Sequence, residues 1–211
     1  MTAACTSQLD PHPAVRPLRV VAAGPEVDLD AARVAAGQFL RALGVGLDRE
    51  STRDTPRRMA EAYAELLTPR AFDLTTFPND EGYDELVLAR SIPVQSVCEH
   101  HLLPFVGIAH VGYLPGDRIL GLSKLARVVE HFARRPQVQE RLTKQVADWL
   151  QDNLAPRGVG VVVQAEHMCM SVRGVRAGGT STVTSALQGL IRDQPSTRAE
   201  FLALTTPTPT S

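Results

Sequence analysis

Metal-ligating and acid–base side chains crowd into the stretch SVCEHHLLPF, residues 96–105. A chain with only three cysteines and six histidines places Cys98, His100 and His101 within four positions here. Two adjacent imidazoles do not both fit an apolar core, because each buried ring nitrogen needs a hydrogen-bonding partner or a metal. We therefore expect one histidine to bind a metal ion while its neighbour transfers protons.

A third metal ligand is predicted in the segment GVGVVVQAEHMCMSVRG, residues 158–174. If this segment is one continuous strand, His167 and Cys169 share a face and lie about 7 Å apart. Cys169 then completes a Cys2His set with Cys98 and His101, which follow a C-x2-H spacing. Three protein ligands are typical of catalytic zinc, which keeps its fourth position for water, and thiolates favour zinc over magnesium or calcium.

His100 and His167 remain as candidates for proton transfer beside that metal. Two alternatives stay open at this point. A closed structural zinc site could use both cysteines and two histidines. The cysteines could also be small buried hydrophobic residues without any metal.

A cationic cluster is predicted at the start of a helix in GLSKLAR, residues 121–127. Ser123, Lys124 and Arg127 fall in its first turns, where backbone N–H groups and the helix dipole favour anions. Arg173 and Arg176 could approach it if the strand ends nearby, which would suit a polyphosphate. An ordinary solvated helix start is the alternative reading.

Gln139 and Glu140 follow Pro136 at the start of another predicted helix. A carboxylate near a helix N-terminus is stabilised by the dipole, which is a structural explanation. The functional alternative is that the carboxylate accepts paired N–H donors from the amidine edge of guanine.

Composition restricts the class of protein. The 211 residues are 44% hydrophobic and 21% charged, ordinary values for a globular protein. The net charge of −1 and 5% aromatic content argue against a nucleic-acid-binding module. No membrane-spanning run or signal peptide is evident, and three cysteines, with Cys5 in the N-terminal tail, do not form a secreted disulfide framework, so we expect a cytoplasmic protein.

Hydrophobic periodicity predicts an α+β fold in which helices cover one face of a largely antiparallel sheet. Asp28 or Asp30, Thr55 and Ser123 are the expected helix caps, with Pro56 as the first residue of the second helix. Helices are predicted at 28–44, 54–67, 122–132 and 136–154, strands at 86–98, 105–114 and 158–174, and a loop at 69–85. The expected organisation is a disordered tail (1–26), an N-terminal helical region (27–85), a catalytic domain (86–204) and a second disordered tail (205–211).

Four quoted segments together resemble GTP cyclohydrolase I, the zinc enzyme that opens pterin biosynthesis. They are SVCEHHLLPFVGIAHVGYLP, GLSKLARVVEHFARRPQVQERLT and EHMCMSVRGV, with DTPRRMAEAY similar to the upstream helix of the family. The likeness runs from about Asp28 to Leu204. It implies the tunnelling fold, with subunits closing into a ring and two pentamers stacking into a homodecamer whose active sites lie at subunit boundaries.

The resemblance also implies roles for individual residues. Cys98, His101 and Cys169 match the ligands of Zn²⁺, and His100 and His167 match the catalytic histidines. Contacts to the substrate GTP match the following residues: Ser123, Lys124, Arg127 and Arg173 for the triphosphate and ribose, Gln139 and Glu140 for guanine, and Arg58 as an arginine supplied by a neighbouring subunit.

The implied reaction converts GTP and water to 7,8-dihydroneopterin triphosphate and formate, the first step of tetrahydrofolate and pterin biosynthesis. His167 protonates the imidazole nitrogen as the guanine ring opens, and His100 and Ser123 assist rearrangement of the ribose. Arg57 and Ser171 depart from residues common in relatives, which bears on triphosphate affinity. The alternatives are a non-catalytic zinc-binding paralogue and a same-fold enzyme serving a deazapurine or secondary-metabolite pathway.

Overall fold

The computed structural model describes residues 18–21, 24 and 26–206 of the chain. Most of the predicted N-terminal tail, and residues 207–211 of the C-terminal one, lie outside this part. Within residues 1–26 the structure forms one strand, β1 (Leu18–Val21), which pairs with β2 (Phe72–Leu74) in an antiparallel two-stranded sheet.

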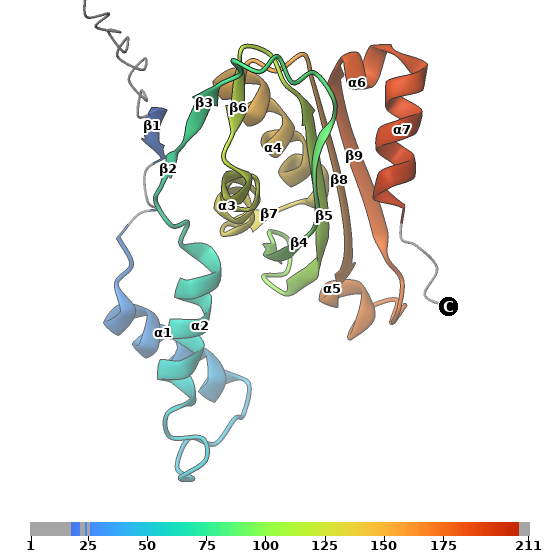
Figure 1. Cartoon of the computed structure of the whole chain (residues 1–211). Coiled ribbons are helices and arrows are strands. Elements are labelled where there is room, and N and C mark those ends of the chain that lie inside the picture. The colour runs from blue at the N-terminus through green and yellow to red at the C-terminus, as the bar shows by residue number, and fades with distance from the viewer. Residues whose placement is uncertain (1–17, 22–23, 25, 207–211) are drawn as a thin grey trace, which may run out of the picture.

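A five-stranded sheet forms the centre of the molecule (Figure 1). Its strand order is β7 (Pro136–Gln137), β4 (Val87–Cys98), β5 (Pro104–Leu114), β8 (Gly158–His167), β9 (Thr182–Gly189). Every neighbouring pair is antiparallel except β4 and the two-residue β7. The prediction of a largely antiparallel sheet in an α+β fold is therefore confirmed.

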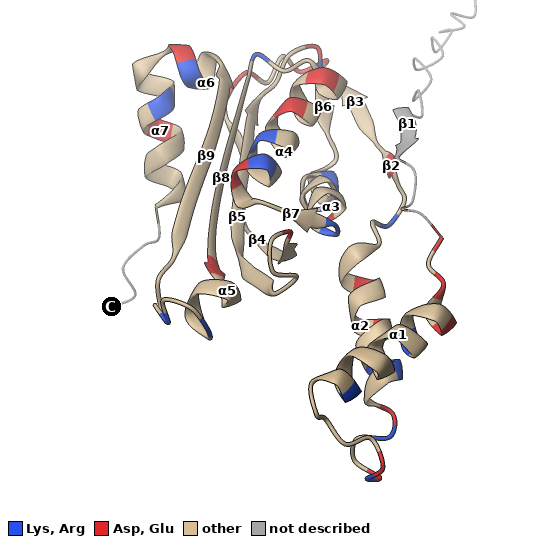
Figure 2. Cartoon of the chain, turned by 180° about the vertical axis from the view of Figure 1, so that it is seen from behind, with Lys and Arg blue, Asp and Glu red and all other residues tan. Residues whose placement is uncertain are grey.

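One face of this sheet is covered by α3 (Leu122–Ala133) and α4 (Gln139–Leu154). Alternation along β8 points Val159, Val161 and Val163 into this layer, and none of them is more than 1% exposed. Figure 2 shows that the strands carry few charged residues, which concentrate on the helices and turns. The large apolar core therefore lies between the sheet and these two helices.

The opposite face is also partly covered, unlike the prediction that helices lie on one face only. The short α6 (Leu190–Asp193) and α7 (Pro195–Thr205) bring Ile191 and Phe201, both fully buried, against it. A Cβ on Gly160 would lie 2.7 Å from the Phe201 ring, so the ring rests directly on the glycine backbone. The helices on this second face were not predicted, because a strand that is buried on both faces loses the alternation of polar and apolar residues.

We expect Phe201→Ala to destabilise the fold by about 3–5 kcal/mol, because Gly160 has no side chain that could fill the cavity left by the ring. Denaturant unfolding measures the effect. The matched control is Leu202→Ala, at a neighbouring position of α7 that is 38% exposed. Equal losses for the two variants would contradict the packing role of Phe201.

The N-terminal helices α1 (Leu29–Ala42) and α2 (Thr55–Leu67) pack on each other and extend away from the sheet (Figure 1). Asp28 caps α1 by accepting a hydrogen bond from the Ala31 N–H at 2.9 Å, as one of the two predicted caps. The expected cap Thr55 is wrong by one residue, because Asp54 is the N-cap of α2 and Thr55 already has helical geometry. None of the helices in the described ranges is long and apolar enough to cross a membrane.

Two segments have a different secondary structure from the one predicted. Residues 69–85, predicted as a loop, contain β2 and β3 (Thr76–Pro78), the latter paired with β6 (Arg118–Leu120). The long strand predicted over 158–174 ends at His167 and is followed by the single-turn helix α5 (Met168–Ser171). The ladder to β5 ends at the pair Phe105–His167, so residues beyond it have no partner strand and the chain turns.

Candidate metal and catalytic site

The end of β4 and α5 lie at the lower edge of the sheet in Figure 1, and three side chains that can bind a metal ion come together there. The ligand atoms of Cys98, His101 and Cys169 all lie within 4.8 Å of one another. Cys98 Sγ is 3.9 Å from His101 Nδ1. His100 Nδ1 also lies 3.8 Å from that sulfur, but His100 is not part of the three-residue cluster. Of the two adjacent histidines, His101 is thus the one that belongs to the cluster with both cysteines.

Cys169 reaches the cluster from α5 and not from a strand. The prediction that His167 and Cys169 share one strand face about 7 Å apart is therefore wrong in its geometry. The turn after His167 nevertheless brings the Cys169 sulfur to Cys98.

The turn that carries His100 and His101 is held by backbone hydrogen bonds at its base. The Cys98 N–H donates to the Leu103 carbonyl at 2.9 Å, and the Leu102 N–H donates to the Cys98 carbonyl at 2.8 Å. Leu102 adopts the left-handed region at φ 52°, and the Tyr63 hydroxyl of α2 donates to its carbonyl at 3.0 Å. Both histidines of this turn are exposed, and Nδ1 of each lies within 4 Å of the Cys98 sulfur.

The donor set fits a tetrahedral cation. Metal–sulfur bonds of about 2.3 Å and metal–nitrogen bonds of about 2.0–2.1 Å put donor atoms roughly 3.5–4 Å apart, close to the observed 3.9 Å. Burial raises the pKa of the Cys169 thiol, and the neighbouring Cys98 raises this pKa further. A bound cation would reverse that preference, because a coordinating thiol is deprotonated outright. The cluster can therefore hold a metal ion.

Arg141 of α4 forms hydrogen bonds with the turn that carries His100 and His101 and with the segment before α4. Its guanidinium donates to Glu99 Oε2, to Gln137 Oε1 at 2.8 Å and to the Pro136 carbonyl at 2.9 Å. The Glu99 N–H donates to the Gln137 carbonyl at 3.0 Å. The hydrogen bond from Arg141 lowers the pKa of Glu99. Arg141 and Glu99 thus orient the segment between Cys98 and His101, a role that the sequence analysis missed.

We expect Arg141→Met to weaken metal binding by about 10- to 100-fold, the usual cost of losing a residue that orients a ligand. Competition with a metal-binding dye measures the affinity. Lys144→Met is the control, because Lys144 lies on the same helix and forms an exposed ion pair with Asp148 at 2.6 Å. Unchanged affinity in Arg141→Met would remove Arg141 from the site.

His167 lies at the end of β8, half-buried, with its ring stacked on Phe105 at 4.6 Å between centroids. Its Nε2 is 2.8 Å from Oε1 of Gln139. Burial lowers the pKa of His167, and the nearby Glu140 carboxylate opposes this change. The structure thus brings His167 and Gln139 together.

Gln139 and Glu140 differ sharply in exposure. Glu140 is exposed, whereas Gln139 is 1% exposed and its amide is hydrogen-bonded inside the domain. Only Glu140 of this predicted pair presents its side chain to the surface.

Two of the expected phosphate residues lie away from the metal cluster of their own chain. Ser123 and Lys124 lie at the start of α3, whereas the end of that helix abuts β4 beside Cys98, where Ser96 Oγ donates to the Ala133 carbonyl at 2.7 Å. The 12 residues of α3 span about 18 Å. The convergence that the sequence suggested is therefore not made by a single chain.

The start of α3 also differs from the prediction. Gly121 is the N-cap and Ser123 lies inside the first turn, so Ser123 is not the cap. The Gly121 N–H donates to the Thr75 carbonyl at 3.0 Å, which fixes where the helix begins. The Ser123 hydroxyl is thereby left at the surface.

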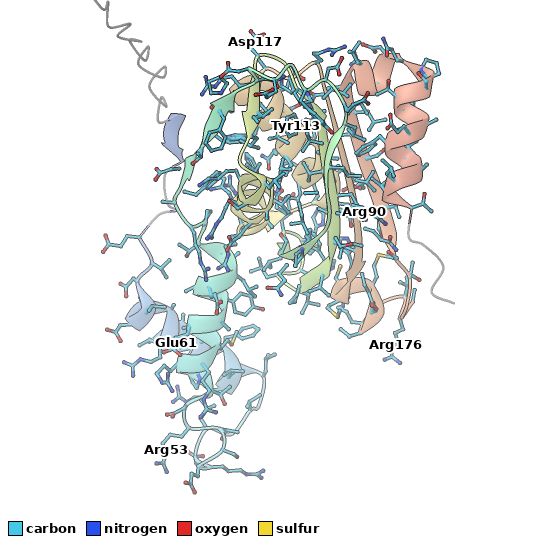
Figure 3. The ribbon with its side chains drawn as sticks, viewed as in Figure 1. Arg53, Glu61, Arg90, Tyr113, Asp117 and Arg176 are labelled. Carbon is cyan, nitrogen blue, oxygen red and sulfur yellow. The ribbon has the colours of Figure 1, made fainter. Side chains whose placement is uncertain are left out.

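The remaining predicted arginines are exposed. Arg127 pairs with Glu130 at 3.3 Å, and Arg58 on α2 lies 4.0 Å from Asp54. Arg173 and Arg176 lie in the loop after α5, and Arg176 points outward from it (Figure 3). Their guanidinium groups are accessible to an anionic ligand.

Comparison with known proteins identifies the family of the chain. A family profile described as GTP cyclohydrolase I matches residues 32–206. The chain is 55% identical over 184 residues to GTP cyclohydrolase 1 of Streptomyces avermitilis, covering 85% of this chain and 91% of that protein. It is 49% identical to GTP cyclohydrolase 1 of Aquifex aeolicus (84% and 97% covered) and 48% identical to that of Mycobacterium tuberculosis (94% and 98% covered). With this site and these similarities along most of its length, the chain belongs to the GTP cyclohydrolase I family.

Proposed function

We propose that the protein converts GTP and water to 7,8-dihydroneopterin triphosphate and formate. The observation that carries this proposal is the cluster of Cys98, His101 and Cys169 with two further histidines beside it, in a chain of this family. A purely structural metal site needs no acid–base residues around it. Here His100 and His167 supply them at the positions that the family resemblance assigns.

Zinc is the metal that the cluster suits best. Two thiolates and one imidazole favour zinc over magnesium or calcium, and three protein ligands leave a coordination position open. Bound zinc supplies Lewis acidity, which makes water nucleophilic near neutral pH. Cys98, His101 and Cys169 would hold it.

The protein side chains supply proton transfer. His167, half-buried against Phe105, would give a proton to the imidazole nitrogen of guanine as that ring opens. His100 is exposed on the turn that also carries His101, and it would assist the later opening of the ribose. Ser123 is the third group assigned to this rearrangement.

Substrate recognition combines one carboxylate with several cations. The exposed Glu140 can accept the N–H groups of the guanine amidine edge. Gln139, the buried residue that precedes it, is the other member of the expected guanine pair. The triphosphate and ribose would be bound by the following residues: Ser123, Lys124, Arg127 and Arg173. Bidentate guanidinium contacts suit phosphate oxygens.

The separation along α3 supports a site shared between subunits. Because Ser123 and Lys124 lie at the end of α3 remote from Cys98, a neighbouring copy must bring its own α3 start to each metal cluster if they act together. We therefore propose the ring of the tunnelling fold and a homodecamer of two stacked pentamers. Arg58 would come from a neighbouring subunit. The exposed apolar residues Val34, Phe39 and Leu43 of the N-terminal helices would be covered in such an assembly.

The biological setting follows from the product. A pterin triphosphate would feed tetrahydrofolate biosynthesis in the cytoplasm, with residues 86–204 as the catalytic unit and 27–85 as the N-terminal helical region. GTP is the small-molecule partner, and neither nucleic acid nor membrane takes part.

The test is to incubate zinc-loaded protein with GTP while following formate and the near-ultraviolet absorbance of the pterin product. Both signals rising together, and both lost in His100→Ser and Cys169→Ala, are expected. Formate without pterin would show ring opening without ribose rearrangement and would direct attention to Ser123. Neither signal, with zinc bound, would contradict the proposal in favour of a non-catalytic paralogue or a same-fold enzyme with another substrate.

A further inference from the structure

We propose that Gln139 acts through His167, as a positioning residue that determines which ring nitrogen of His167 exchanges a proton with the substrate. This inference rests on the proposed function, in which His167 is the proton donor. It assigns to the Gln139 side chain a task other than contact with guanine. The argument starts from the hydrogen bonds around its amide.

The orientation of the Gln139 amide is determined by its neighbours. Its Nε2 lies 3.0 Å from the Val163 carbonyl and 2.9 Å from the Thr182 carbonyl. Carbonyl oxygens only accept hydrogen bonds, so the amide nitrogen must face them and the amide oxygen must face the other way. The reversed amide would set oxygen against oxygen at both positions. Oε1 of Gln139 therefore points at His167.

Two threonine hydroxyls complete the arrangement. The Thr143 hydroxyl donates to the main-chain carbonyl of Gln139 at 2.8 Å. With its hydrogen used there, Thr143 must accept from Thr184 across their 2.6 Å contact. The Thr184 oxygen is then an acceptor for Gln139 Nε2 at 3.1 Å. The two amide hydrogens of Gln139 are thus shared among three acceptors, and all the hydrogen-bond directions in this network agree.

The network decides the state of the His167 ring. Because Oε1 of Gln139 can only accept, Nε2 of His167 at 2.8 Å must carry a hydrogen. That hydrogen stays in place whether or not the ring carries a second proton. Stacking on Phe105, with 13° between the ring planes, fixes the remaining rotation.

Nδ1 is consequently the atom of His167 that exchanges a proton with the substrate. In the ring-opening step the proton moves from Nδ1 to the imidazole nitrogen of the base. His167 is left neutral with its Nε2–H still donating to Gln139, and Nδ1 regains a proton from solvent. Loss of the Gln139 acceptor frees the ring to turn or to change tautomer, as a histidine does when its orienting partner is removed.

The first test uses Gln139→Met in the zinc-loaded protein. We expect kcat to fall by about 10- to 100-fold, as for other residues that orient a functional group, while KM for GTP changes by less than about 3-fold because uniform substrate binding is kept. A rise in KM with kcat preserved would overturn the proposal and return Gln139 to guanine binding. Glu140→Gln is the comparison, with its main effect on KM.

The second test uses Thr184, where the chemistry can be removed and restored. Thr184→Val keeps the volume but cannot accept from Gln139. Because the Val163 and Thr182 carbonyls still accept from the amide, kcat should fall by less than in Gln139→Met, and Thr184→Ser should recover it. Equal kcat in the valine and serine variants would contradict the network. In a His167→Asn background, Gln139→Met should have little further effect on kcat, because the two residues act as one unit.

The third test does not depend on activity. In protein labelled with ¹⁵N-histidine, the His167 resonances should report hydrogen on Nε2 in the wild type and a mixture of tautomers in Gln139→Met. If the wild type makes no formate or pterin but shows this signature, the proposed function fails and the positioning network stands. If the wild type is active and His167 carries its hydrogen on Nδ1, the network fails and the function stands.

Discussion

Cys169→Ala is expected to abolish pterin formation, with a loss of activity of about 10³-fold or more, because it removes one of three metal ligands and several kcal/mol of charge stabilisation. Cys169 is the member of the cluster that comes from α5, while Cys98 ends β4 and His101 lies in the turn that follows it. A site with two protein ligands binds a metal ion much more weakly than a site with three. We therefore expect the metal to be lost together with the activity.

The measurement is the metal content of the purified variant beside its rate of formate and pterin formation. The thermal stability of the variant should stay close to that of metal-free wild type, because Cys169 is only partly buried. Cys5→Ala is the control, since Cys5 is the one cysteine outside the predicted ligand set. Full metal content and full activity in Cys169→Ala would exclude Cys169 as a ligand.

His167→Asn is expected to lower kcat by about 10²- to 10⁴-fold, the usual contribution of a positioned acid–base group. The metal ligands are unchanged in this variant, so its metal content should equal that of the wild type. The side chain of asparagine is polar and smaller than imidazole, so it can occupy the space beside Phe105 without a clash. The loss is therefore predicted for the chemical step alone.

Single-turnover formation of formate, with metal content measured on the same sample, tests this prediction. The matched control is His131→Gln. His131 is another partly buried histidine, packed against Phe72 and Phe132 and not a member of the three-residue cluster, so kcat should be kept. An unchanged rate of formate release in His167→Asn would remove His167 from the ring-opening step.

Much of the domain could be predicted because its signals are local. The stripe of apolar residues on α4, the alternation along β5 and the Asp28 cap each depend on residues close in sequence. The same holds for Cys98 and His101, whose spacing within one turn already brings them together. Cys169 was added from its place in the segment 158–174, and the family resemblance agreed, although the strand geometry expected there was wrong.

The sequence by itself therefore determined the α+β class, the central strands and helices, and the three residues of the candidate metal cluster. Only the tertiary structure decided where β8 ends, since that depends on how far its partner β5 extends. It also decided that Gln139 of α4 faces inward. The acceptors that orient its amide come from β8 and β9, which are remote in sequence: Val163, Thr182 and Thr184. The separation of Ser123 from the metal cluster along α3 is likewise a property of packing. Hydrogen-bond partners and distances between remote segments are set when the chain folds, and residue spacing carries no record of them.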